Sequence, residues 1–138
     1  MRSAKLSEHI VVPVANESDA RSTAAALEAY RFGQATVVHV VEKGDGVPDK
    51  TPVEQSEQIA TEAFQAFKDT FPAAETELVY DRDVVKGITD VAATVGASAI
   101  VFQPLPGGRL QRFLAGDRSL RLITEAERPV IALHGGDR

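Results

Sequence analysis

Two neighbouring segments of this 138-residue chain carry residue types that bind anions. In the first segment, Gly107 and Gly108 stand directly before Arg109. In the second, Gly116 precedes Asp117. Glycines let main-chain amides approach a phosphate, and arginine binds phosphate oxygens through paired hydrogen bonds. An anion cradle is therefore one interpretation of residues 107–109. A Pro-Gly turn of type II, extended by Gly108, explains the same residues more simply, and we favour it.

Other catalytic or metal-binding patterns are weak. The three histidines, His9, His39 and His134, fall in or beside apolar runs without the helical spacing of metal ligands. Asp81 and Asp83 form a carboxylate pair, but a loop and a helix cap explain them better. The chain has no cysteine, and no serine stands in a nucleophile-elbow pattern. We therefore expect neither a metal site nor an enzyme, and we treat His39 as structural.

Composition limits the class of protein. A hydrophobic fraction of 43% with 25% charged residues is typical of a folded globular chain, and the length suits one domain over residues 1–138. The net charge of −5 disfavours nucleic acid as a partner, because phosphate backbones are bound by surplus lysine and arginine. Apolar runs are too short for a signal peptide core or a membrane helix. We expect a cytoplasmic protein.

Five β-rich runs alternate with four helical patterns, which predicts an α/β fold with a parallel sheet. The predicted strands are residues 9–14, 35–42, 75–80, 98–103 and 129–133, and the predicted helices are residues 19–32, 53–71, 83–95 and 117–125. Ser18 or Asp19 is expected to cap the first helix, with Tyr30 on its buried face. Asp83 is expected to cap the start of the third helix, and Gly96 to end it. Residues 43–52 are expected to form an exposed loop.

Ligands of open parallel sheets lie outside the carboxyl ends of the strands, where the strand order reverses. The loops after the first and fourth strands are therefore the places to search for a site. The candidate ligand pocket consists of residues from these loops and the strands beside them: Pro13, Val14, Ala15, Val40, Phe102, Gln103, Gly107, Gly108, Arg109, Gly116 and Asp117.

The order of these elements resembles the universal stress protein family over nearly the whole chain. The likeness is most specific in the last third, where Leu114-Ala115-Gly116-Asp117 precedes a helix and Arg128-Pro129-Val130 begins the last strand. The resemblance implies a five-stranded parallel sheet of order 3-2-1-4-5 with helices on both faces, a Rossmann-like fold of the adenine-nucleotide alpha-hydrolase type.

Nucleotide-binding members of that family carry the motif G-x2-G-x9-G-[ST]. Counting back from Gly116, this chain has Pro106 and Gln103 at the two upstream glycine positions, and Asp117 at the [ST] position. An aspartate about 4 Å from a phosphate charge costs up to ~4 kcal/mol at an effective dielectric of 20. Such members also tend to have an aspartate at the end of the first strand, where this chain has Ala15. We read Asp117 as a helix cap and expect no ATP.

The resemblance implies a stress-response or regulatory role through protein or small-ligand binding, with no cofactor. The alternative is a nucleotide-binding member that holds ATP or AMP on a shifted loop at Gly107, Gly108 and Arg109. A flavin protein fits less well, because the first loop lacks the Ser and Thr cluster that a flavin phosphate needs. Regulation of a membrane transporter stays open. Family members often dimerise through the last strand, so we expect a homodimer whose contact is the apolar edge of Val130, Ile131, Ala132 and Leu133.

Overall fold

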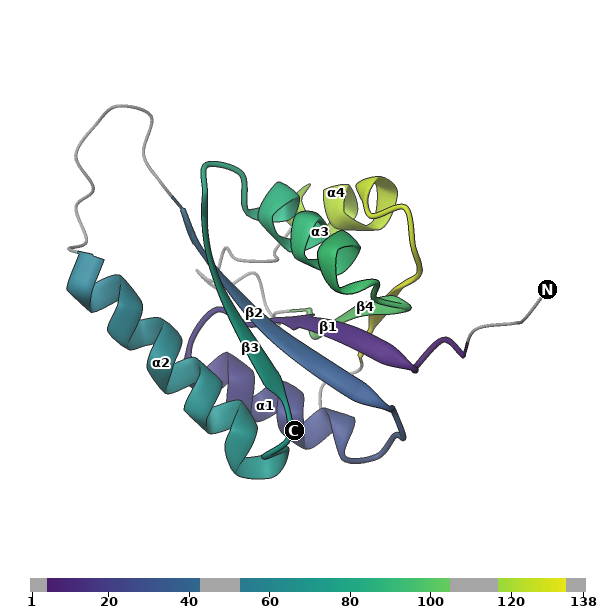
Figure 1. The fold of residues 1–138 in the computed structure, drawn as a ribbon, viewed down its shortest axis with the longest axis horizontal. Coiled ribbons are helices and arrows are strands. Elements are labelled where there is room, and N and C mark those ends of the chain that lie inside the picture. Colours follow the sequence, from purple (N-terminus) through teal and green to yellow (C-terminus); the bar gives the residue numbers. More distant parts are fainter. Residues whose placement is uncertain (1–4, 43–52, 105–116, 134–138) are drawn as a thin grey trace.

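The computed structural model describes residues 5–42, 53–104 and 117–133 (Figure 1). Five parallel strands form one sheet of order β3-β2-β1-β4-β5, which confirms the predicted topology. Along the chain the elements are β1 (His9–Pro13), α1 (Glu17–Leu27), β2 (Gln34–Glu42), α2 (Val53–Thr70), β3 (Glu75–Asp81), α3 (Val84–Val95), β4 (Ala99–Phe102), α4 (Asp117–Glu125) and β5 (Val130–Ala132). No helix within these described ranges combines the length and apolar character needed to cross a bilayer.

Two apolar layers cover the sheet, one on each face. Side chains alternate along β1, so Ile10 and Val12 join the cluster under α1 and α2, while Val11 joins the cluster under α3. Figure 1 shows α1 and α2 together on one side of the strands and α3 with α4 on the other. The near-continuous apolar runs of β1, β2 and β4 thus follow from burial on both faces.

The first helix begins earlier and ends earlier than its pattern predicts. Asn16 is its N-cap, because the Asn16 side-chain oxygen accepts a hydrogen bond from the Asp19 amide at 2.8 Å. Beyond Leu27 the hydrogen bonds join residues three apart instead of four: the amide of Tyr30 donates to the Leu27 carbonyl. Tyr30 is therefore 59% exposed, and its predicted place on the buried face is wrong.

The third helix agrees with its predicted signals. The Asp83 carboxylate accepts hydrogen bonds from the amides of Val85 and Lys86, and Gly96 ends the helix in the left-handed conformation. Asp81 in turn accepts a hydrogen bond from the Asp83 amide at 2.9 Å. The two carboxylates thus act as a turn and a helix cap, as predicted. The expected loop at 43–52 lies outside the described residues.

Candidate functional site

The carboxyl end of β1 lies between its neighbours β2 and β4, where the strand order reverses. We call the residues gathered around this end the mouth of the sheet: Ala15, Asp19, Glu42, Gln103 and Arg118. α1 leaves the end of β1 on one face, and α4 follows β4 on the other. The mouth therefore has an α1 side and an α4 side, which differ in chemistry.

On the α1 side, the Asp19 carboxylate turns back to the end of β1. One carboxylate oxygen, Oδ2, accepts a hydrogen bond from the Ala15 amide at 2.7 Å. The other, Oδ1, lies 3.5 Å from the Thr23 hydroxyl. Burial raises the pKa of Asp19 to about 6, against the opposing effect of the hydrogen bonds from Ala15 and Thr23. The sequence pattern indicated only a possible helix cap at Asp19, so this carboxylate at the mouth is a residue that the pattern missed.

Gln103, the residue after β4, lies on the same side of the mouth. Its side-chain oxygen accepts a hydrogen bond from the Ser22 hydroxyl at 2.9 Å and lies 3.4 Å from the Thr23 hydroxyl. Ser22 and Thr23 belong to α1, so these contacts tie the end of β4 to this helix. Gln103 stands where the family motif has a glycine, and its side chain contacts α1.

His39 lies in β2 on the same face. Its Nδ1 atom donates to the carbonyl oxygen of Val14 at 2.9 Å, and burial lowers the pKa of His39 against the opposing effect of this hydrogen bond. A neutral imidazole held by main chain is a structural histidine, as predicted. Among the described residues, no three His, Asp or Glu side chains come together as a metal ion would require.

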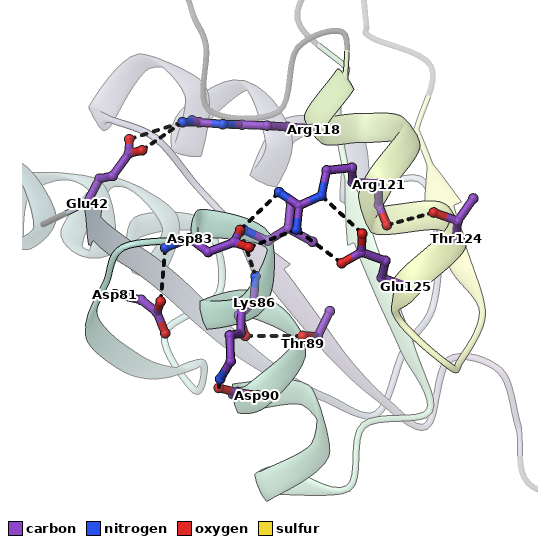
Figure 2. Close-up of polar contacts among 11 residues, drawn as sticks. Glu42, Asp81, Asp83, Lys86, Thr89, Asp90, Arg118, Arg121, Thr124 and Glu125 are labelled. Carbon is purple, nitrogen blue, oxygen red and sulfur yellow. Dashed lines mark hydrogen bonds and ion pairs between the residues drawn. The ribbon is translucent and has the colours of Figure 1, made fainter. Parts of the chain in front are cut away.

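On the α4 side, two arginines pair with carboxylates of the chain itself (Figure 2). Arg121 of α4 contacts both oxygens of Asp83, at 3.2 and 2.8 Å, and also bonds to Glu125. The hydrogen bond from Arg121 lowers the pKa of Asp83. These bonds fix the start of α3 against α4.

Arg118 extends from the first turn of α4 toward Glu42, the last residue of β2 (Figure 2). Its Nη2 atom lies 3.1 Å from both carboxylate oxygens of Glu42. This ion pair therefore ties the start of α4 to the end of β2. The Arg118 side chain is 28% exposed and the Glu42 side chain 50%, so the arginine is partly shielded while the carboxylate faces solvent.

The described members of the predicted pocket lie on both faces of the sheet. Val40 and Phe102 are buried in the cluster under α3 and α4, whereas Val14 is buried in the cluster under α1 and α2. Pro13 is also buried, so Ala15 and Gln103 are the predicted residues that the structure places at the mouth. Asp117 is the first residue of α4. The remaining predicted residues, Gly107, Gly108, Arg109 and Gly116, lie outside the described part of the chain.

Several solved structures share this fold. A universal stress protein from Archaeoglobus fulgidus in complex with dAMP is 25% identical, with 94% of this chain and 99% of that chain covered at a TM-score of 0.65. UspA from Lactobacillus plantarum is 23% identical, with 95% and 99% covered at a TM-score of 0.65. A universal stress protein in complex with cAMP is 17% identical, with 94% and 98% covered at a TM-score of 0.62.

The sequence itself gives the family. No curated protein matches it significantly. The family model described as the universal stress protein family matches residues 7–134, which include all nine helices and strands of the described part. The chain therefore belongs to the universal stress protein family.

Proposed function

We propose that this chain is a non-enzymatic regulatory domain of the stress response, which acts in the cytoplasm by binding a protein or a small ligand and does not hold ATP. One observation carries the proposal: carboxylates of the chain itself already engage the polar groups of the mouth that would bind phosphate. Glu42 pairs with Arg118, and Asp19 accepts the hydrogen bond of the Ala15 amide. An incoming triphosphate would have to displace both carboxylates.

Charge supports the same conclusion. A phosphate needs donors and positive charge, and a carboxylate close to it raises its free energy of binding. Asp19, Glu42 and the α3 cap Asp83 all stand near the ends of the strands, together with Asp117 at the start of α4. The complexes of relatives with dAMP and cAMP favour the alternative, in which AMP or ATP lies beside residues 107–109.

Isothermal titration with ATP and magnesium decides between these functions. We expect a dissociation constant weaker than about 10 μM, because Asp19 and Glu42 already engage the Ala15 amide and the Arg118 side chain. Asp117→Ser should tighten binding at least tenfold, since it removes one negative charge and restores the hydroxyl of the family motif. Asp90→Asn, a change of the same charge on the exposed surface of α3, should leave the affinity unchanged. Wild-type binding tighter than about 10 μM would contradict the proposal.

We also propose that two copies pair through β5. β5 is an edge strand, so its outer side has no neighbour in the described sheet. The Leu133 amide bonds to Phe102 and the Pro129 carbonyl accepts from Ile100, so the odd positions of β5 face β4. By alternation, the main-chain groups of Val130 and Ala132 point to the open edge, where a second copy can pair with them. Leu133 is instead buried in the core.

Light scattering at micromolar concentration should give the mass of a dimer. Ala132→Pro should halve this mass, because proline removes an outward amide without disturbing a bond to β4. Circular dichroism of the variant checks that it is folded. Ile123→Ser, on the exposed surface of the neighbouring α4, is the matched control and should stay dimeric. A monomeric wild-type protein would rule the dimer out.

A further inference from the structure

The sheet has a second edge, at β3, which is longer than the edge at β5. β3 is the first strand in the order and pairs with β2 alone, from Glu75 to Asp81. Its register runs without interruption from Thr36 opposite Glu75 to Glu42 opposite Asp81, so no bulge bends this edge. Within the described ranges, no strand pairs with the outer side of β3. Figure 1 shows β3 along one side of the sheet, with α2 and α3 to either side of it.

The outward main-chain groups of β3 belong to its even-numbered residues. The Val14 amide donates to the Val38 carbonyl, so the even positions of β2 face β1 and its odd positions face β3. In a parallel pair, an odd residue of β2 bonds to the two neighbours of its partner, so the odd residues of β3 carry the bonds to β2. The amides and carbonyls of Thr76, Leu78 and Tyr80 therefore point to the open edge. Strand geometry spaces these residues about 6.6 Å apart in one line, so a single extended chain reaches all of them.

The side chains on the two faces of this edge differ in chemistry. On the α3 face Val79 packs against the core, and Glu75 and Glu77 share that face by alternation. Both glutamates are exposed, and neither forms an ion pair with another described residue. The opposite face carries the side chain of Tyr80, whose hydroxyl donates to Glu57 of α2 at 2.8 Å. The open edge thus has two negative charges on one side and an aromatic ring on the other.

The two glutamates decide which kind of strand can join this edge. Antiparallel pairing of two copies about Thr76 would set Glu75 opposite Glu77. Pairing about Leu78 would set Glu75 opposite Asp81 instead. Like charges directly opposite each other destabilise a strand pair, so these residues protect the edge against a second copy of the chain. A strand with lysine or arginine at alternate positions meets opposite charges, and the net charge of −5 adds to the attraction.

We infer that the β3 edge binds an extended segment of a partner protein that carries lysine or arginine at every second residue. This segment adds to the sheet antiparallel to β3, which is the orientation that is more stable per residue. Its basic side chains pair with Glu75 and Glu77, and the apolar side chains between them lie beside Leu78 and Tyr80. The inference goes beyond the proposed function, because the two glutamates lie opposite the first half of β2, away from the mouth at the end of that strand.

A capped peptide of four Lys-Val repeats is the probe. In an NMR titration of the full chain at low salt, it should shift the amide signals of Thr76, Leu78 and Tyr80, with a dissociation constant on the order of 100 μM. A peptide of four Lys-Pro repeats is the matched comparator, because it keeps every charge and lacks the valine amides that would bond to these residues. It should bind at least about tenfold more weakly. A peptide of four Glu-Val repeats keeps the amides but reverses the charge, so it should leave these signals unshifted.

Reversing the charge of the edge tests the role of the side chains. The double variant Glu75→Lys with Glu77→Lys should bind the Lys-Val peptide at least about tenfold more weakly and should now bind the Glu-Val peptide. The matched control is Glu28→Lys with Glu62→Lys, which makes the same change in net charge at exposed positions after α1 and on α2. It should bind the Lys-Val peptide nearly as the wild type does. Circular dichroism of both double variants checks that they are folded.

The outcomes separate strand addition from simple attraction between charges. Equal affinities for the Lys-Val and Lys-Pro peptides would mean that charge alone attracts the peptide. Shifts at Val130 and Ala132 in place of β3 would put the peptide on the β5 edge. Either result, an equal loss of affinity in the two double variants, or no shift at all would overturn the inference. The ATP titration is made without the peptide, so its result stands whichever way the peptide binds.

Discussion

In the Gly33→Ala variant, we expect the free energy of unfolding to fall by at least about 2 kcal/mol. Gly33 lies beside the entry to β1, where its amide donates to the Ser7 carbonyl at 2.8 Å. A Cβ atom at this position would lie 2.4 Å from the carbonyl oxygen of Glu8. The atom that it meets belongs to the main chain, so no side chain can move aside. The variant must separate the start of β2 from β1, whose register begins with His9 opposite Gln34.

Urea denaturation of the wild type and the variant measures this loss. Gly96→Ala is an informative comparison, because a Cβ at Gly96 meets no atom within 4 Å but stands on a backbone with φ of 68°. Alanine in this left-handed conformation should cost about 1 kcal/mol. Gly33→Ala should therefore lower the free energy of unfolding more than Gly96→Ala does. A smaller loss for Gly33→Ala than for Gly96→Ala would contradict the close approach.

The sheet could be predicted because each of its strands is marked by its own residues. Apolar runs such as residues 35–42 indicate strands buried on both faces, and the family resemblance supplies their order. The start of α3 was also predictable, since Asp83 stands directly before the apolar stripe of this helix. The start of α1 was not, because Asn16, Ser18 and Asp19 are all good caps and the choice depends on tertiary contacts.

The mouth was predictable in position but not in chemistry. Motif spacing identifies Gln103 as a lost glycine, yet it does not reveal that Gln103 contacts Thr23, 80 residues earlier. Arg118 and Glu42 are likewise 76 residues apart, and each alone looks like an ordinary surface charge. Such pairs follow from the crossing of elements in the folded sheet. Only the spacing of Asp19 and Thr23, one helical turn apart, was visible as a local signal.

Asp19→Asn should raise the free energy of unfolding at pH 7.5 by about 1–2 kcal/mol. In the folded protein, burial raises the pKa of Asp19 from 3.8 to about 6. The folded state therefore binds more protons than the unfolded state between about pH 4 and pH 6, and the stability contributed by the protonated form is lost as the pH rises through this window. A shift of one pKa unit corresponds to about 1.4 kcal/mol in the free energy of unfolding. Solvent around a partly exposed carboxylate reduces the gain expected from the whole pKa shift.

The pH profile of the two proteins is the decisive measurement. Asparagine keeps an acceptor for the Ala15 amide and has no charge to bury, so its advantage should be present at pH 7.5 and vanish by about pH 4, where the wild-type carboxyl is largely protonated in the folded state. Asp90→Asn loses only an exposed pair with Lys86 and should show no such gain at pH 7.5. If Asp19→Asn were less stable than the wild type at pH 7.5, the fold would favour the charged form of Asp19, and its pKa would be lowered instead of raised. The carboxylate would then be a stabilising anchor of the mouth.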